Sequence, residues 1–330
     1  MNTTSATTYI SNIDDDEFLI RLDRLRKFKS RPAQEIDILY DDNNFTSNSV
    51  WNLDSQQDFV WQIIQDNQIY AIVADGHGNS KVVNWLRSKS DTYLYSVCSS
   101  VEPTKTLEAD LENEINTYNS GACISIIRTN MTDNMEVFWI GDTMTQVYMN
   151  GVRVAQTESH TGEVESEFHR KIDEGGVFKK EMMLTILPEI TNNPHITMVE
   201  GFRCNHSPSD YMGRDNLQMT RCAGHCGVTG YNYGHLEVCF TPDDDIKIIT
   251  ASDGVWDVIH ESESLAGIVT ASELVDFAAK RWCGNWNYVH HAEHKCKKCN
   301  CKKPDEQVIS VQQGIPPDDI SVSLIHLPKK

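Results

Sequence analysis

The 330-residue sequence contains no apolar run that approaches the ~20 residues of a membrane-spanning helix. Its N-terminal stretch, MNTTSATTYISNIDDD, lacks the basic and apolar regions of a secretory signal peptide. Internal repeats and Pro-rich linkers are absent too, so no domain boundary stands out. These absences predict a cytoplasmic protein with no membrane partner.

Positive charge is scarce, because 29 Lys and Arg residues stand against 48 Asp and Glu residues, a formal net charge of -19. Such an excess repels the phosphates of nucleic acids and of anionic lipids, so we expect neither as a partner. A phosphorylated substrate would need local cations, which bound metal ions supply. Apolar residues make up 39% of the chain, enough for a core in one large domain or two small ones.

The stretch IYAIVADGHGNSKVVNWLR, residues 69–87, joins a strand pattern to a helix pattern. An apolar run ends just before Asp75 and His77. After Asn79 and Ser80, apolar residues recur at helical spacing, and either of these two residues can cap the helix. The neighbouring glycines let the backbone approach a ligand closely. Asp-Gly is also a common hairpin signal, but a hairpin should return as a strand, and this segment enters a helix.

Three further aspartates stand at the ends of apolar, strand-like runs: Asp142, Asp253 and Asp318. Acidic side chains at strand ends can converge on one site rich in hard oxygen ligands. Such a site suits Mg²⁺ or Mn²⁺ better than zinc. The alternative for each residue is an ordinary role in forming a turn.

Periodicity predicts alternating strands and helices along the chain. Strands are expected at residues 58–64, 69–74, 121–128, 136–140, 145–149, 246–252 and 320–327, and helices at 18–28, 105–115, 163–174 and 270–282. Thr270 and Glu273 form a capping box for the last helix. Residues 41–49 are predicted as a loop, and residues 188–234 show no clear pattern. Strand clusters interrupted by helices indicate a layered α+β fold.

Five blocks occur in one order: ADGHG, SGACISIIR, FWIGDTMTQVYMNG, ASDGVWDVI and DDISVSLI. Their order and spacing resemble the protein phosphatase 2C family of metal-dependent serine/threonine phosphatases. The resemblance implies a β-sandwich of two antiparallel sheets flanked by helices. We expect residues 1–45 to be a partly disordered N-terminal extension, and residues 46–330 to be a single phosphatase-like domain with a Cys/His-rich insertion near residues 283–303.

The same resemblance implies a site for two Mg²⁺ or Mn²⁺ ions, with Asp75 as the bridging carboxylate. The positions that match metal ligands are Asp58, Asp75, the carbonyl of Gly76, Asp253 and Asp318. His77 matches the histidine that protonates the leaving serine or threonine oxygen, and a structural role is its alternative. Asp142 and Asp257 match acidic positions that serve an outer or third ion, or they are ordinary turn and helix-start residues.

The implied reaction is hydrolysis of a phosphorylated protein by metal-bound hydroxide, with no phosphoenzyme. The protein is expected to be a monomer.

Three positions depart from the family pattern. Leu53 stands where an arginine grips the substrate phosphate, a bidentate contact that leucine cannot make. Gln57 stands where a glutamate is expected, and His225 where an aspartate is expected. The alternative function is therefore a pseudophosphatase that acts as a binding or regulatory module.

Ten cysteines without a secretory signal predict reduced thiols or metal ligands rather than disulfides. The candidate ligands of a structural zinc are Cys283, His294, Cys296, Cys299 and Cys301. A solvated basic loop with free thiols is the alternative, and a zinc-dependent interaction protein is the function that the cluster would support. A second and looser set of candidate zinc ligands consists of Cys204, His206, Cys222, His225 and Cys226.

Overall fold

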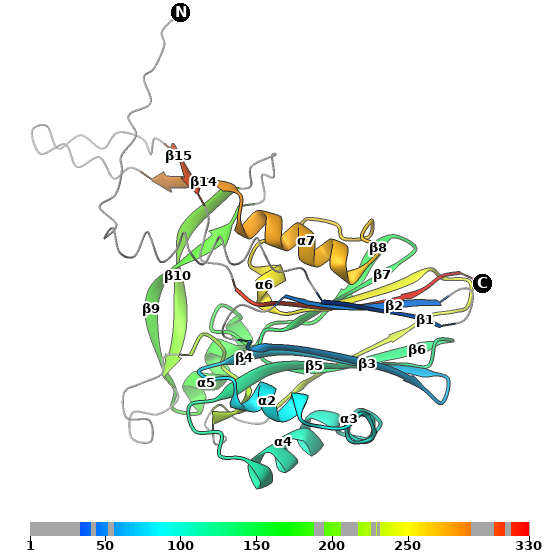
Figure 1. The fold of residues 1–330 in the computed structure, drawn as a ribbon. Coiled ribbons are helices and arrows are strands. Elements are labelled where there is room, and N and C mark those ends of the chain that lie inside the picture. The colour runs from blue at the N-terminus through cyan, green and yellow to red at the C-terminus, as the bar shows by residue number, and fades with distance from the viewer. Residues whose placement is uncertain are drawn as a thin grey trace, which may run out of the picture.

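The computed structural model describes residues 34–40, 44–51, 56–187, 195–205, 217–225, 229, 232–291, 307–313 and 318–329. Two six-stranded sheets stack face to face, and helices cover their outer faces (Figure 1). A smaller sheet stands at one end of this sandwich (Figure 1). The predicted α+β sandwich of two antiparallel sheets flanked by helices is therefore confirmed, with a third sheet added.

The strands of the first sheet lie in the order β1 (Gln34–Tyr40), β2 (Asn44–Trp51), β16 (Ile320–Leu327), β13 (Ile246–Ala251), β7 (Met144–Met149) and β8 (Val152–Gln156). Those of the second lie in the order β12 (Gly234–Cys239), β6 (Asn134–Ile140), β5 (Gly121–Thr129), β4 (Gln68–His77) and β3 (Asp58–Gln65), with the short β11 (Ala223–Gly224) beside β5. Neighbouring strands in both sheets are antiparallel.

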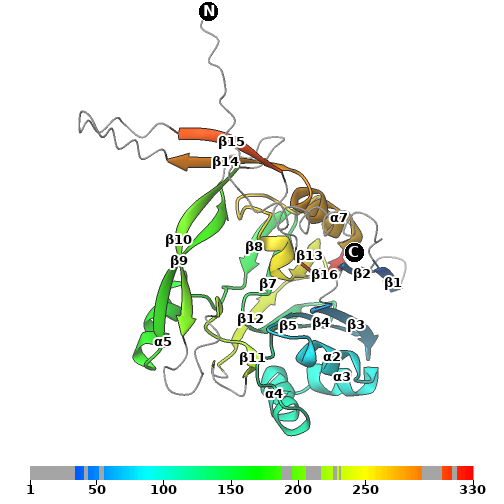
Figure 2. The ribbon, with the colours of Figure 1, turned by 60° about the vertical axis from the view of Figure 1, so that its left-hand side comes forward.

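The third sheet has the order β15 (Gln307–Gln313), β14 (Asn285–His291), β10 (His195–Asn205) and β9 (Val177–Ile186). Figure 2 shows β9 and β10 running along one side of the sandwich, with β14 and β15 across their end. The sequence patterns do not predict this sheet, because strands such as VFKKEMMLTI mix charges and methionines without a clear alternation.

The second sheet is covered by helices α2 (Lys81–Arg87), α3 (Asp91–Cys98) and α4 (Pro103–Glu114) (Figure 1). The first sheet is covered by α6 (Asp253–Trp256) and α7 (Ala271–Trp282). Helix α5 (Glu165–Asp173) packs beside β9. In the described part of the chain, every helix is too short or too polar to cross a membrane.

Strand β4 is buried on both faces, because it lies between the helices and the other sheet. Tyr70 and Ile72 pack against the helices, whereas Ile69 and Ala71 join the core between the two sheets. Successive side chains of a strand point to opposite faces, so Asp75 has the same orientation as Ile69 and Ala71. The carboxylate is therefore directed toward the opposing sheet.

The prediction of a loop at residues 41–49 is wrong, because β2 starts within it. Its serine side chains are buried, and Ser47 Oγ accepts a hydrogen bond from the Ala271 N–H at the start of α7 (2.7 Å). Serine and asparagine favour turns over strands, but hydrogen bonding to β1 on one side and β16 on the other overrides that preference.

The N-terminal boundary differs in detail from the sequence-based expectation. Residues 34–40, inside the segment 1–45 predicted as an extension, form β1 at the edge of the first sheet. The predicted helix at residues 18–28 lies outside the described residues.

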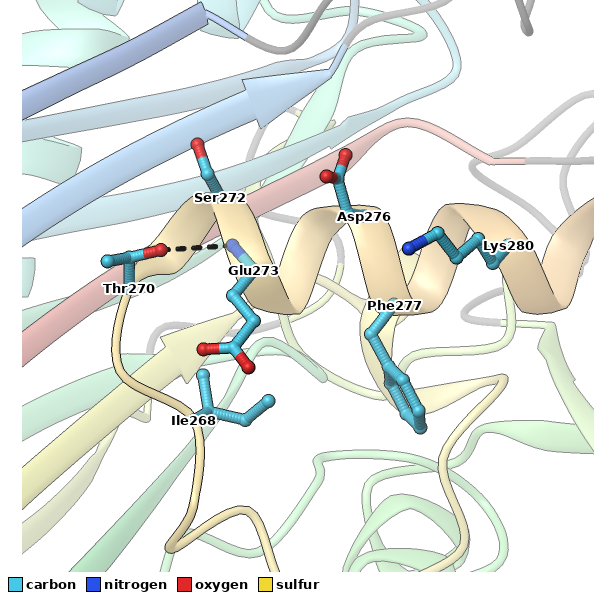
Figure 3. A pocket seen from close by; sticks show the side chains of 7 residues that line it. All are labelled: Ile268, Thr270, Ser272, Glu273, Asp276, Phe277 and Lys280. Atoms are coloured by element: carbon cyan, nitrogen blue, oxygen red, sulfur yellow. Dashed lines mark hydrogen bonds between the residues drawn. The ribbon is translucent and has the colours of Figure 1, made fainter.

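Helix α7 begins as its sequence predicts. Thr270 Oγ1 accepts a hydrogen bond from the Glu273 N–H (3.1 Å, Figure 3), and the Glu273 carboxylate accepts one from the Val269 N–H (2.8 Å). The apolar face buries Leu274 and Trp282 against the first sheet. The Glu273 N–H is one of the donors that the first turn of a helix leaves without an intrahelical partner, whereas the Val269 N–H precedes the N-cap residue.

Replacing Thr270 with alanine should lower the free energy of unfolding by about 1 kcal/mol, because the N-cap acceptor is lost. Chemical denaturation measures this change. Thr270→Ser keeps the hydroxyl and should retain most of the stability, so equal losses in the two variants would contradict a capping role.

Candidate metal centre

Strand directions bring the strand-end aspartates to one edge of the sandwich. Asp58 begins β3 and is the register partner of Asp75 near the end of β4. In the facing sheet, β13 ends beside the start of β16, so Asp253 and Asp318 lie at the same edge. Asp142 stands in the connection from β6, in the second sheet, to β7, in the first.

Three of these aspartates form the tightest acidic group among the described residues. Asp75, Asp142 and Asp253 each offer a carboxylate oxygen, and the three oxygens all lie within 4.8 Å of one another. The nearby Asp75 side chain partly offsets the rise in the pKa of Asp253. Within the described structure, the buried Oδ1 of Asp142 has no hydrogen-bond partner.

The electrostatics of this group are unfavourable without a cation. Desolvation, followed by the charge of Asp142, raises the pKa of Asp253 from 3.8 to about 6. Desolvation, and then the charges of Asp253 and Asp58, raise the pKa of Asp75 well above its usual value. Desolvation also raises the pKa of Asp58, although the Ser252 hydroxyl donates to its carboxylate and acts in the opposite direction.

The donor set fits a hard divalent cation. Carboxylate oxygens from three separate chain segments are the ligands that Mg²⁺ and Mn²⁺ prefer. A cation among Asp75, Asp142 and Asp253 would remove their mutual repulsion and satisfy the buried Asp142 oxygen. Asp142, predicted for an outer or third ion, therefore lies closer to Asp75 than the sequence suggested.

The other predicted acidic positions surround this group without joining it. Asp58 and Asp318 are near enough for their charges to raise the pKa of Asp75. Asp257 follows α6 and is exposed. Asp318 is exposed, whereas its neighbour Asp319 is buried and accepts a hydrogen bond from the Gln57 N–H (2.7 Å).

Gly76 must be a glycine for reasons of space. Its N–H donates to the Gln57 carbonyl oxygen (2.8 Å). A Cβ at this position would lie 2.7 Å from Val83 Cγ2 and 2.8 Å from that carbonyl oxygen. The end of β4 is thus packed between α2 and the residue that precedes β3, which fixes the position of the Asp75 carboxylate.

His77 lies against His225, the residue found where the resemblance led us to expect an aspartate. His225 Nε2 and His77 Nδ1 are 2.9 Å apart, and the two rings stack with centroids 4.8 Å apart. Gly121 makes the pairing possible, because a Cβ there would lie 2.5 Å from His77 Cε1 and 2.4 Å from His225 Cδ2. The departure from the family pattern therefore changes the surroundings of the predicted proton donor.

Gly121→Ala should push both imidazole rings aside and lower the free energy of unfolding by about 1–3 kcal/mol, the usual range for overpacking. Gly267→Ala is the matched control, because a Cβ at Gly267 meets nothing within 4 Å. Thermal unfolding of the two variants measures the difference. A Gly121→Ala protein as stable as the control would contradict the packing described above.

Two residues near the acidic group escaped sequence analysis. Cys123 is the register partner of Asp75 across β4 and β5, and its thiol hydrogen-bonds to Asp142. Asp319 holds the backbone of Gln57, as described above. The sequence marks these residues only by their position, because Cys123 lies in the SGACISIIR block and Asp319 lies beside Asp318.

Several predicted positions lie outside the described residues, namely Leu53, His206, Cys226, His294, Cys296, Cys299 and Cys301. Cys283 is the C-cap residue of α7 and is half-buried. Cys204 is buried in β10. Of the looser set, Cys222 and His225 approach each other together with His77.

A surface pocket beside α7 is a different feature from the acidic group. It is lined by Thr270, Glu273, Asp276, Phe277 and Lys280, together with neighbouring residues (Figure 3). None of the strand-end aspartates is among its lining residues.

Comparison with known proteins supports the family suggested by the sequence blocks. A sequence profile described as Protein phosphatase 2C matches residues 62–283, more than half of the chain. A search of curated proteins found no match.

Similar solved structures include a C. elegans sex determining protein, with 14% identity and a TM-score of 0.51 over 86% of this chain and 65% of that one. This chain thus spans about two thirds of the length of that protein. A Mycobacterium tuberculosis serine/threonine phosphatase has 15% identity and a TM-score of 0.42, over 90% of this chain and 97% of that one. A Toxoplasma gondii phosphatase has 11% identity and a TM-score of 0.47, over 88% and 95%.

The profile match covers the segment that contains Asp75, Asp142 and Asp253, and the sandwich has the architecture that the resemblance implied. The chain therefore belongs to the protein phosphatase 2C family.

Proposed function

We propose that this protein is a serine/threonine phosphoprotein phosphatase that depends on Mg²⁺ or Mn²⁺. The observation that carries the proposal is the group formed by Asp75, Asp142 and Asp253, whose oxygens lie within 4.8 Å of one another. Family membership supplies the reaction class, and the acidic group supplies a place for the cation that the reaction needs.

Asp75, Asp142 and Asp253 would hold a divalent cation. Asp58, Asp318 and the carbonyl of Gly76 are the candidate ligands for a second ion. Bound divalent cations lower the pKa of water and neutralise charge on phosphoryl oxygens. With a formal net charge of -19, the chain needs such local positive charge to accept a phosphorylated substrate.

His77 is the residue that we assign to proton transfer. Its ring follows Asp75 by two positions on β4, so both side chains share one face of the strand. An imidazole can hold a proton at neutral pH and release it to a leaving serine or threonine oxygen. His225 would orient that ring through the contact at 2.9 Å.

The test is release of phosphate from a phosphoserine or phosphothreonine peptide by the full chain. Activity should appear with Mn²⁺ or Mg²⁺ and disappear with a chelator. His77→Gln should retain Mn²⁺ binding by the acidic group but lose most of the turnover. A wild-type protein that binds Mn²⁺ and releases no phosphate would refute the catalytic proposal.

A binding or regulatory module without catalysis is the second candidate function. The observation that favours it is His225, which replaces an expected acidic residue and contacts His77. Gln57 carries no charge on its side chain, so it contributes less to cation binding at the same edge of the site than the expected glutamate would. In this case, calorimetry should find one weakly bound metal ion or none, and the double change Leu53→Arg and Gln57→Glu should create activity. Robust wild-type turnover would exclude this candidate.

A further inference from the structure

A second group of potential metal ligands lies beside the acidic group and differs from it in chemistry. His77, Cys222 and His225 each offer one ligand atom, and the three atoms all lie within 4.8 Å of one another. We propose that these residues bind Zn²⁺ or a transition-metal ion with similar ligand preferences. This site is distinct from the Mg²⁺ or Mn²⁺ site of the acidic group.

The ligand types identify the class of ion. Two imidazole nitrogens and a thiolate are typical zinc ligands, and they are poor ligands for Mg²⁺, which prefers oxygen. Cys222 and His225 are buried, and His77 is half-buried. Three ligands leave a fourth tetrahedral position for water or another group.

The present spacing needs only a small adjustment. Zinc–nitrogen bonds of about 2.0–2.1 Å in a tetrahedral arrangement place two ligand nitrogens roughly 3.3 Å apart. The observed separation between His77 Nδ1 and His225 Nε2 is 2.9 Å. The two nitrogens would therefore have to move apart by about 0.4 Å, and both rings would have to turn their lone pairs toward the ion.

The backbone around the ligands is well anchored. The His225 N–H donates to the Ser120 carbonyl oxygen (2.9 Å), and His225 has a φ of 48°. Thr229 Oγ1 accepts hydrogen bonds from the Cys222 N–H (3.2 Å) and from its thiol (3.4 Å). Strand β11 lies between Cys222 and His225 and pairs with β5, so both ligands are held against the sheet that carries His77.

Cobalt(II) titration tests the proposal, because Co²⁺ replaces zinc and gives a charge-transfer absorption only when a thiolate is bound. The protein is the full chain with Cys296, Cys299 and Cys301 changed to serine, which removes the competing cysteine cluster. Excess Mg²⁺ occupies the acidic group. One equivalent of Co²⁺ should produce the thiolate absorption, and added Zn²⁺ should abolish it.

Two variants assign the ligands. Cys222→Ser should abolish the thiolate absorption, and His225→Asn should weaken Co²⁺ binding at least ~100-fold, since changes to groups that merely support ligands already cost about 10- to 100-fold. Asparagine tolerates the positive φ at position 225, so the backbone should be kept. Cys98→Ser, which changes a buried cysteine in the helical layer, is the matched control and should leave the absorption unchanged.

Absence of the absorption in the parent protein, or its persistence in Cys222→Ser, would overturn the proposal. Thermal unfolding of each metal-free variant shows whether it is folded. The readout is spectroscopic and requires no phosphatase activity. A failure of the proposed phosphatase function would therefore leave this result unaffected.

Discussion

Replacing Asp75 with asparagine should reduce Mn²⁺-dependent phosphate release by more than ~100-fold, because loss of a direct ligand exceeds the 10- to 100-fold cost of losing a group that only supports one. Asp75 lies in the acidic group, with a carboxylate oxygen within 4.8 Å of one from Asp142 and one from Asp253. Asparagine keeps the size of the side chain and removes its charge. Initial rates measured over a range of Mn²⁺ concentrations should show both weaker metal activation and a lower maximum.

The control for this variant is Asp243→Asn, which makes the same chemical change in an exposed turn between β12 and β13. It should leave activity unchanged. In the absence of metal, Asp75→Asn should also be at least as stable as the wild type, because it removes a repelled, desolvated carboxylate. An Asp75→Asn protein that keeps wild-type activity would exclude Asp75 as a ligand of the catalytic metal.

Metal-free protein should lose stability as the pH rises from about 4 to 6. The folded pKa of Asp253 is about 6 and its ordinary value is 3.8, so the folded state binds more protons than the unfolded state in this window. This stabilisation is fully present below pH 3.8 and is lost as the pH passes the folded pKa. The shift of Asp253 alone corresponds to about 3 kcal/mol, and the raised pKa of Asp75 acts in the same direction.

Denaturant unfolding in chelator, repeated across this pH window, measures the loss. Saturating Mn²⁺ should remove most of it, because a bound cation favours the charged carboxylates. Asp253→Asn should flatten the profile in chelator, whereas Asp243→Asn should not. A metal-free wild type whose stability is constant or rises from pH 4 to 6 would contradict the electrostatics described for the acidic group.

The central strands of the sandwich could be predicted from local patterns, because these strands are strongly apolar, whereas the sandwich itself was implied by the resemblance to the family. Residues 69–74 form a continuous apolar run, and residues 246–251 are mostly apolar, as a strand buried on both faces requires. Strand β2 and the third sheet could not be predicted in this way. Their residues are polar or mixed, and they become strands only because neighbouring strands supply hydrogen-bond partners.

The sequence by itself determined that Asp75 and Asp253 stand at the ends of buried strands, because strand ends are marked locally by apolar runs and glycines. Only the tertiary structure decided that Asp142, rather than Asp58 or Asp318, completes the closest group with them. It also decided that His225 meets His77. These contacts depend on strand register and on the stacking of two sheets, which join positions far apart in the chain, and no local pattern encodes such distances.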